Sequence, residues 1–436
     1  MTDPVSYFAS VAAERRRCFW LDGGGAREWS GRRSLIGWLD DDDVSLTWSS
    51  ARREVRAHSG GSSRVVGDDV FAVLEEWLRP GEQWFGYLGY ASRTDLPAAA
   101  DPLLPDAVWM RPSSVRVFEH APHPGVSRLV AGAPRTSTTE GPPPRTSTTE
   151  ALPVEVRAER ASKPRPDEYD VAFAAVQEHL HAGNSYEVNL THRLTREADL
   201  DPVTAYLRLR ELNPAPYSGF LQHDVDDARA WLLSSSPERY ALVTPDRHLE
   251  TKPIKGTTPR GTTPEEDEAH RARLATDPKT RAENLMIVDL LRNDLSLVCE
   301  VGSVEVPALM EVESYESVHQ LVSTVRGRLR DDVTTVGALR ALFPAGSMTG
   351  APKLRTMQVI EEVEATPRGV YAGAFGWISG DGPADLGVVI RSLTTDGSGR
   401  WSLGTGGGIT VRSDVAEEWA ESEWKAERLL RVFDSL

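Results

Sequence analysis

The pattern of apolar and polar positions predicts a protein built from both strands and helices. In the first part of the chain, short apolar runs such as CFWLDGG, SLIGWLD and VSLTW are interrupted by Gly and Asp, as strands are at turns. The aromatic run WFGYLGY predicts a closely packed strand pair. Residues 168–183 show helical spacing, with Phe173, Val176 and Leu180 on one face and Gly183 as the stop signal. Strand-like and helical segments then alternate to the end, which predicts an α+β fold.

Changes in composition divide the chain into three parts. Residues 1–131 form a strand-rich N-terminal region. The heptapeptide PRTSTTE then occurs at 134–140 and again at 144–150, and the surrounding Pro/Ser/Thr-rich stretch has too few apolar residues to offset the entropy of ordering. We therefore expect a flexible loop or linker at 132–153; a phosphorylated or partner-binding segment is the alternative. The candidate chemistry lies beyond it, in an expected catalytic domain at 160–436.

Charge and composition limit the classes of partner. The 436 residues carry a formal net charge of −16, which argues against nucleic acid, whose phosphates attract a basic face. A small anionic substrate stays compatible with this charge, because a few local cations or a metal can reverse the field in a cleft. Cys18 and Cys299 offer no disulfide framework, and the chain has no apolar run of about 18 residues. We expect a soluble cytoplasmic protein without a membrane segment.

A lysine and a glutamate are the first candidates for chemistry. The segment ETKPIKGTTPRG at 250–261 places Lys255 between a proline on one side and a glycine on the other. A lysine held in this way at a strand end is placed for chemistry rather than for solubility. Glu238 follows Pro237 in a polar turn after the strand-like AWLL. If that turn faces Lys255 across a cleft, the two residues form an acid and a nucleophile; a surface Glu–Lys contact is the alternative.

Three glutamates suggest a site for a divalent metal. The segment 281–294 predicts a helix in which Glu283 lies on the apolar stripe, where a carboxylate is costly unless it is paired or bound to a cation. In a second predicted helix at 414–434, Glu418 and Glu421 are three positions apart and repel each other unless a cation lies between them and a ligand. Oxygen ligands without His or Cys suit Mg²⁺. The alternatives are a boundary glutamate that captures an arginine and a solvated acidic face.

Three further segments suggest binding of anions. The run GTGGGI at 404–409 offers consecutive backbone amides that can hold a carboxylate, although such a run is often a turn. In the segment 347–362, Thr349 and Pro352 are expected to open a helix whose free N–H groups give a second anion site. Arg391 is the one charge in the apolar strand-like GVVIRSL, and a buried arginine there favours a bidentate anion.

In this order, the motifs SPERY, PIKGT, RAENLMIVDLLRND, HQLVSTV, GSMTGAPK, YAGAFGW, VVIRSL and GGGI resemble those of the chorismate-utilising enzymes. The resemblance runs over about residues 165–430 and more weakly back to the N-terminal strands. It implies a single large α+β unit of two facing antiparallel β-sheets with outer helices. Lys255, the Pro-Ile pair before it and the segment RAENLMIVDLLRND resemble the corresponding sequences of the aminodeoxychorismate synthases, component I. The lysine alone leaves isochorismate synthesis open. Gln320 stands where anthranilate synthases usually have histidine, which disfavours an aromatising pyruvate elimination.

The resemblance also implies roles for individual residues in binding chorismate. The implied catalytic residues are Lys255 and Glu238; the substrate-binding residues are Tyr371, Arg391, Thr349, Gly406, Gly407 and Gly408; the Mg²⁺ ligands are Glu283 and Glu421, with Glu418 close by or through water. In this scheme Glu238 protonates the departing ring hydroxyl, Lys255 forms a covalent adduct with the ring, and ammonia then displaces the lysine. Because Lys255 must be neutral part of the time, we expect desolvation and the metal to lower its pKa.

The chain shows no glutaminase signature, so we expect ammonia from a separate glutamine amidotransferase subunit. The product then serves para-aminobenzoate and folate synthesis or a specialised metabolite. The resemblance also implies a tryptophan site between the N-terminal region, 184–190 and 213–217, as an effector or a buried structural ligand. Two alternatives stay open: an isochorismate, 2-amino-2-deoxyisochorismate or anthranilate-type synthase, and a non-catalytic subunit that binds chorismate or tryptophan.

Overall fold

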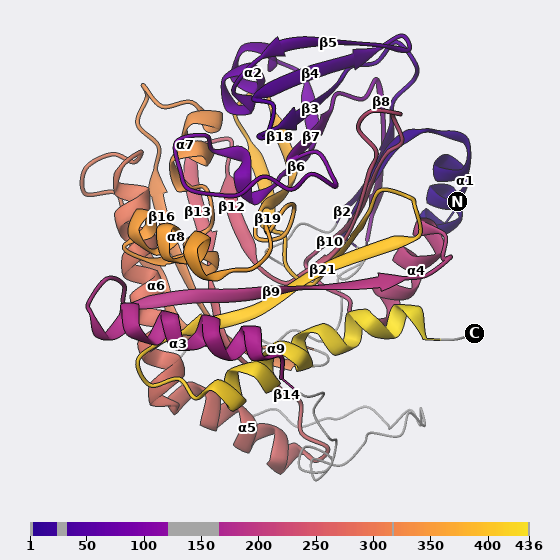
Figure 1. The fold of residues 1–436 in the computed structure, drawn as a ribbon. Helices are drawn as coiled ribbons and strands as arrows, with labels where there is room; N and C mark the ends of the chain where they lie inside the picture. Colours follow the sequence, from indigo (N-terminus) through magenta and orange to yellow (C-terminus); the bar gives the residue numbers. More distant parts are fainter. Residues whose placement is uncertain (1–2, 24–32, 121–164, 316–317, 435–436) are drawn as a thin grey trace, which may run out of the picture.

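Two large antiparallel sheets with helices on their outer faces make up the protein, which confirms the predicted fold class (Figure 1). The computed structural model describes residues 3–23, 33–120, 165–315 and 318–434. The linker predicted at 132–153 lies outside the described residues. Among the described helices, none is long and apolar enough to cross a membrane.

The first sheet has nine strands. Their order is β17 (Gly350–Ala351), β9 (Glu187–Glu197), β21 (Arg400–Ile409), β20 (Ser392–Thr395), β11 (Ala230–Ser236), β10 (Tyr217–His223), β1 (Arg17–Asp22), β2 (Arg33–Trp38) and β8 (Ser114–Glu119). Strands β9 and β21 are paired along ten consecutive positions, from Glu197 opposite Arg400 to Val188 opposite Ile409. This long ladder is the rigid base on which one side of the candidate site is built.

The second sheet has twelve strands. Eleven follow the order β14 (Ile254–Pro259), β16 (Val318–Arg328), β13 (His248–Lys252), β12 (Arg239–Val243), β19 (Ala384–Val388), β18 (Ala374–Ser379), β6 (Gln83–Leu88), β7 (Ala107–Met110), β3 (Ser45–Ser49), β4 (Glu54–Ser59) and β5 (Ser62–Gly67), and β15 (Glu305–Ser314) also pairs with β16. The strand that carries Lys255, β14, is therefore at one end of this order. The aromatic run WFGYLGY supplies most of β6, and its Gly86 lies against the backbone of Val108 on β7, where a side chain would not fit.

The N-terminal strands are divided between the two sheets. Strand β1 lies between β2 and β10, and β6 lies between β7 and β18, so each sheet combines strands from both halves of the chain. A core of large apolar side chains joins the sheets, and in it the rings of Phe19 on β1 and Phe85 on β6 stack with 4.1 Å between their centroids. Gly219 on β10 leaves room for the ring of Phe375 on β18. The N-terminal region is thus part of the same core as the catalytic region.

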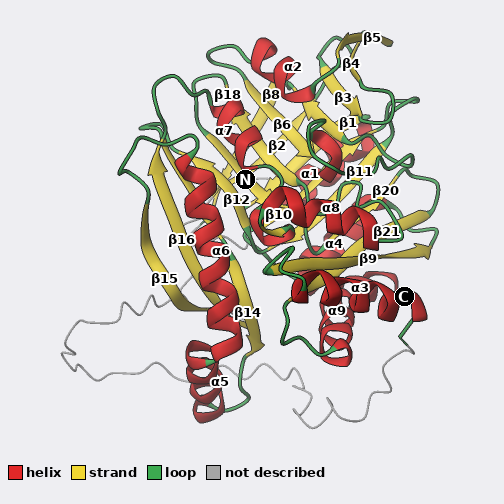
Figure 2. Ribbon diagram, turned by 60° about the vertical axis from the view of Figure 1, so that its left-hand side comes forward, coloured by secondary structure: helices red, strands yellow, loops and turns green. Residues whose placement is uncertain are grey.

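The helices cover the outer faces of the sheets. They are α1 (Pro4–Glu14), α2 (Val70–Trp77), α3 (Asp167–His181), α4 (Pro202–Leu212), α5 (Pro264–Thr276), α6 (Pro278–Ser296), α7 (Thr335–Leu342), α8 (Lys353–Val363) and α9 (Val415–Leu430). Helix α3 confirms the prediction, with acidic residues in its first turn and Gly183 at φ +73° just beyond its end. Helices α3 and α9 lie along β9 and β21 (Figure 1), and α6 lies against β14 and β16 (Figure 2).

Candidate active site

Lys255 is the second residue of β14, and its ammonium group points into a buried site. Its side chain is only 11% exposed, and Nζ forms an ion pair with Oε1 of Glu187, the first residue of β9. Gly256, directly after the lysine, adopts φ +82° and lies against Thr280 at the start of α6. The tight backbone at this glycine directs the lysine from the second sheet toward the first. The strand-end position predicted for Lys255 is therefore confirmed.

Glu187 was missed by the sequence analysis. Its carboxylate is fully buried, and Oε2 has no hydrogen-bond partner, whereas Oε1 meets Lys255. Gly408 on the neighbouring strand β21 leaves the space for this pair, because a Cβ there would overlap Oε1 of Glu187 and lie 3.0 Å from Nζ of Lys255. The sequence offered one signal, a lone acidic residue beside the apolar positions of YEVNL. The contact itself joins residues 68 positions apart, which sequence periodicity does not reveal.

The predicted lowering of the Lys255 pKa is wrong for the protein without a metal. Burial does lower the pKa of this lysine, but the carboxylates of Glu187, Glu283 and Glu238 outweigh burial and raise it. A buried amine among three carboxylates holds its proton more tightly, because the charged form is stabilised by each of them. Lys255 is therefore an ammonium group in this structure, and chemistry at its nitrogen needs an acceptor for a proton.

Glu238 lies between β11 and β12, 5% exposed, and is bound by a neighbouring loop. The hydroxyl of Ser347, in the 3-10 helix Gly346–Met348, donates a hydrogen bond of 2.5 Å to its Oε1. A small cavity of about 250 Å³, open space included, adjoins both residues. Burial raises the pKa of Glu238 to about 7, while Ser347 and Lys255 oppose that rise. A carboxyl group with this pKa is a suitable general acid at neutral pH.

The three glutamates proposed as metal ligands lie on α6 and α9 in different surroundings. Glu283 on α6 is partly buried, its Oε1 has no hydrogen-bond partner, and burial raises its pKa to about 7. Glu418 is 4% exposed and accepts a hydrogen bond of 2.8 Å from Lys279. Glu421 is half exposed and pairs with Lys425 at 2.9 Å. Two lysines therefore neutralise two of the carboxylates, and the third is left without a counter-charge of its own.

Within the described ranges, no three carboxylate, histidine or cysteine side chains gather into one metal-binding group, so the predicted trio is not assembled around a common centre. The donor chemistry still fits Mg²⁺, because all three side chains offer hard oxygen atoms. The unpartnered buried oxygen of Glu283 is the strongest support, since an uncompensated buried carboxylate favours a cation. A cation shared with Glu418 or Glu421 would compete with Lys279 and Lys425 for their oxygens.

The glycine run is a strand rather than the turn or nest that was predicted. Gly406, Gly407 and Gly408 belong to β21 and are paired with β9 on one side. On the other side, pairing with β20 ends at Ser402, so in the described part of the sheet no strand covers that edge of the glycines. A Cβ at Gly407 would lie 3.3 Å from Oε2 of Glu418. The run therefore brings bare backbone close to the carboxylates of Glu187 on β9 and Glu418 on α9.

Two predictions on the anion-binding segments need correction. Helix α8 begins at Lys353 after Pro352, and Thr349 does not cap it: the threonine is fully buried, and its Oγ1 donates to the carbonyl of Gly346 at 3.2 Å. Arg391 is not inside a strand but in the connection between β19 and β20, with φ +49°. Its guanidinium has no hydrogen-bond or ion-pair partner among the residues described, and burial lowers its pKa to about 10. An arginine in this state is prepared to receive an anion.

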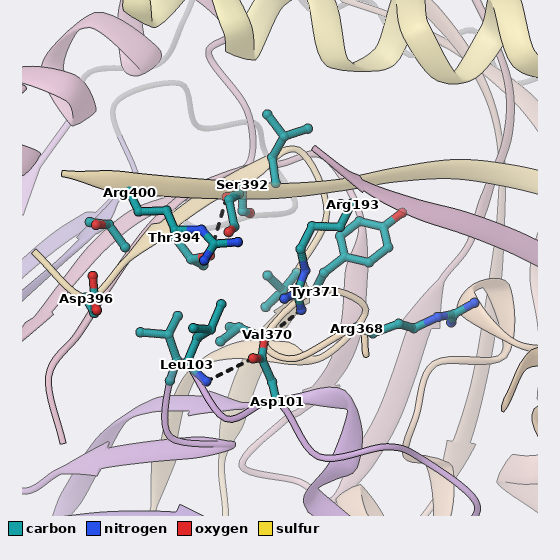
Figure 3. A pocket seen from close by; sticks show the side chains of 16 residues that line it. Asp101, Leu103, Arg193, Arg368, Val370, Tyr371, Ser392, Thr394, Asp396 and Arg400 are labelled. Carbon is teal, nitrogen blue, oxygen red and sulfur yellow. Dashed lines mark hydrogen bonds and ion pairs between the residues drawn. The ribbon is translucent and has the colours of Figure 1, made fainter. Parts of the chain in front are cut away.

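Tyr371 stands between the candidate site and a separate cavity. Its ring packs on Gly404 of β21, burial raises its pKa, and Glu238 is among the charges that act on it. The cavity, about 570 Å³ with its mouth, includes Tyr371 in its wall together with the ion pair of Arg193 and Asp101 at 2.6 Å (Figure 3). Figure 3 shows the Tyr371 hydroxyl directed away from that ion pair. Lys255, Glu238 and the metal-ligand candidates do not line this cavity.

Comparisons with known proteins show which sequences the chain is similar to. The family model of chorismate binding enzymes matches residues 16–431. The chain is 40% identical to an aminodeoxychorismate synthase of Streptomyces pristinaespiralis over 98% of its own length and 63% of the relative's. It is 50% identical to an aminodeoxychorismate synthase of Streptomyces griseus over 65% of its length and 38% of the relative's. It thus spans less than two thirds of the length of these relatives.

Solved structures agree on the fold. The crystal structure of anthranilate synthase component I from Streptococcus pneumoniae superposes with a TM-score of 0.70 at 25% identity, over 93% of each chain. The menaquinone-specific isochorismate synthase of Escherichia coli gives a TM-score of 0.67 at 17% identity, covering 99% of this chain and 92% of the other, and shows the fold alone. With nearly its whole length matched by the family model, the chain belongs to the chorismate-binding enzymes.

Proposed function

We propose that this chain replaces the ring hydroxyl of chorismate by an amino group from ammonia, giving 4-amino-4-deoxychorismate. The observation that carries the proposal is the buried Lys255, held by Glu187 and acted on by the charge of Glu238, a carboxyl group with a pKa of about 7. The relatives named aminodeoxychorismate synthase, which include component 1 from Escherichia coli at 42% identity over 62% of this chain, support this choice within the family.

The reaction needs an acid and a nucleophile, because hydroxide is a poor leaving group at neutral pH. Glu238 donates its proton to the departing hydroxyl, which leaves as water. The amine of Lys255 attacks the ring with migration of the ring double bonds, so that one difficult displacement becomes two easier ones. Ammonia then attacks the carbon that lost the hydroxyl, the double bonds return, and the lysine is expelled. Chorismate and ammonia give aminodeoxychorismate and water.

Different parts of the site bind the two carboxylates of the substrate. The guanidinium of Arg391 and the hydroxyl of Tyr371 hold the enolpyruvyl carboxylate, and Arg391 is suited to it because it lacks a protein partner in the described structure. Gly406, Gly407 and Gly408 place backbone amides near the ring carboxylate. Glu283, with Glu421 and Glu418, would hold Mg²⁺, which neutralises the ring carboxylate when bound.

Ammonia reaches the site from a glutamine amidotransferase in this proposal, as the name "component 1" of the Klebsiella aerogenes and Escherichia coli relatives suggests. Free ammonium replaces that supply in vitro. The product serves para-aminobenzoate synthesis for folate or a specialised aromatic metabolite. A bound tryptophan and a cytoplasmic location stay predictions of the sequence, and a role limited to binding is the alternative to the proposed reaction.

The test is the mass of the product formed from chorismate and Mg²⁺, with and without ammonium. An ammonium-dependent product that carries ¹⁵N from labelled ammonium is expected. Lys255→Ala should abolish it, and Lys252→Ala is the matched control, because Lys252 is the last residue of β13, which β16 separates from β14, and it forms an ion pair with Glu313 of β15. A nitrogen-free isomer of chorismate in both conditions would instead show isochorismate synthesis, and undiminished turnover by Lys255→Ala would exclude the covalent step.

A further inference from the structure

The ion pair between Lys255 and Glu187 raises a problem that the proposed reaction does not solve. An ammonium group has no lone pair and cannot attack a ring carbon. In the described structure Glu187 is the sole hydrogen-bond and ion-pair partner of Nζ, and the lysine is buried among carboxylates that stabilise its charge. Before each attack, one proton must leave Nζ for an acceptor within the site.

The neighbouring carboxyl groups are not equally suited to accept it. Glu238 is hydrogen-bonded to Ser347 and has to deliver its own proton to the departing hydroxyl. In the described structure Glu283 forms no hydrogen bond or ion pair with Nζ, and it is the main candidate for the cation. Glu187 alone touches Nζ through Oε1, and its second oxygen, Oε2, is buried without a partner. Oε2 can therefore carry a proton without loss of the contact through Oε1.

The surrounding strands fix this arrangement. Glu187 is at the first position of β9, next to Ala351 of β17, and its carboxylate lies over the backbone of Gly408 on β21. Lys255 comes from β14 of the other sheet. Because three backbone segments hold the pair and no side chain at position 408 separates them, the carboxylate stays against the amine throughout the reaction.

We propose that Glu187 is the base that takes a proton from Lys255 for its attack on the ring and returns it when the lysine is expelled. This assignment rests on the proposed function. In the first step the proton moves from Nζ to Glu187, a bond forms between Nζ and the ring, the ring C–O bond breaks, and the hydroxyl leaves as water with the proton of Glu238. In the second step ammonia bonds to the ring and the Nζ–ring bond breaks. Lys255 recovers its proton from Glu187, and the new amine gives one proton to Glu238, so both acids are restored.

The wild-type protein provides the first test, which does not depend on turnover. Competitive labelling of Lys255 with acetic anhydride in metal-free protein, read by peptide mass spectrometry, measures the pH at which the amine becomes reactive. The charged groups that act on this amine are Glu187 on β9, Glu283 on α6, Glu238 after β11 and, on α9, Glu421. We expect a midpoint above the ordinary lysine value. A midpoint below it overturns the assignment, because an amine that is already neutral needs no base.

The second test is the pH profile of kcat in Glu187→Gln at saturating chorismate and ammonium. The amide keeps the shape of the side chain but accepts no proton, so we expect the kcat of the variant to be at least about tenfold below that of the wild type at pH 7. The ratio of the two kcat values at equal pH should approach one near pH 10, where solvent deprotonates the lysine, because ionisation of Glu238 slows both proteins alike. The KM for chorismate should change by less than about threefold. An unchanged rate, or a loss that is the same at every pH, overturns the assignment.

The two hypotheses fail in different ways. If wild-type protein forms no ¹⁵N-labelled product, the proposed function fails, whatever the labelling midpoint of Lys255. If wild-type protein forms that product and Glu187→Gln shows a pH-independent profile, the function stands and Glu187 is a positioning residue. Should the variant fail to fold, a labelling midpoint of the wild-type protein below the ordinary lysine value still overturns the assignment.

Discussion

Ser347 donates a hydrogen bond of 2.5 Å to Glu238, across 109 positions of sequence, and this bond connects the proposed acid to the 3-10 helix that precedes β17, an edge strand of the first sheet. Burial raises the pKa of Glu238 to about 7, and the bond from Ser347 is the largest of the interactions that oppose the rise. The proton affinity of the acid thus depends on the loop directly before β17. This dependence can be measured.

Replacing Ser347 by Ala should raise the pKa of Glu238 further, because the hydroxyl stabilises the carboxylate form. A reaction that needs the protonated acid declines as the pH rises through that pKa. The falling limb of the kcat profile should therefore move to higher pH by about one unit. Ser347→Thr, which keeps the hydroxyl, is the control. If the falling limb of the kcat profile stays at the same pH in Ser347→Ala, Glu238 is not the acid whose ionisation that limb reports.

The same acid should reduce the stability of the protein at alkaline pH. Its pKa is about 7 in the folded chain and 4.5 in the reference state, so its contribution to stability is complete below pH 4.5 and is lost as the pH rises through 7. Glu238→Gln, which cannot ionise, should be more stable than wild type at pH 8 by roughly 3 kcal/mol as an upper value and similar at pH 4.5. Urea unfolding at both pH values measures the difference; an equal difference at the two values contradicts the prediction.

Binding of Mg²⁺ should depend on pH through Glu283. Because burial raises the pKa of this residue to about 7, a proton competes with the cation in the acidic range. The affinity for Mg²⁺ should therefore rise about tenfold from pH 6 to pH 8. Calorimetric titration of the protein without substrate measures it, and Glu283→Gln should bind weakly at every pH. A constant affinity of the wild-type protein over this range would exclude Glu283 as a ligand.

Two adjacent glycines should respond differently to alanine. At Gly408 a methyl group overlaps Oε1 of Glu187 and approaches Lys255, so Gly408→Ala should lower kcat at least about tenfold by separating the pair. At Gly407 the nearest atom is Oε2 of Glu418 at 3.3 Å, the end of a flexible side chain, so Gly407→Ala should cost less. Steady-state kinetics of both variants, with folding checked by circular dichroism, make the comparison. Equal losses of kcat in the two variants would mean that the glycine at position 408 is not required for the contact between Lys255 and Glu187.

Local sequence patterns predicted helix α3, but they did not predict the backbone conformation at the glycine run or at Arg391. Helix α3 followed from apolar spacing and a glycine stop, and both signals act within one helical turn. The glycines at 406–408 were interpreted as backbone amides that hold a carboxylate, with a turn as the alternative. In the protein they belong to a strand, because β9 pairs with them along their full length. Arg391 was placed in a strand because its neighbours are apolar, whereas φ +49° puts it in a connection.

The sequence singled out residues of the candidate site but not the contacts between them. Lys255, Glu238 and Glu283 were found because each is a charged residue in an unusual local setting. Glu187, Lys279 and Lys425 were missed, since each becomes significant only through a partner on another element. For the protein without a metal, the direction of the Lys255 pKa shift was wrong for the same reason: burial is visible in a sequence pattern, but the carboxylates that outweigh it lie on distant strands and helices.

The division of the first eight strands between both sheets has a consequence for how the chain holds together. Removing them would strip β10 and β18 of their neighbours β1 and β6 and leave two long rows of unpaired backbone groups in the middle of the molecule. The half that carries the chemistry is therefore not an independent folding unit, and its edges depend on residues that never approach the reacting atoms.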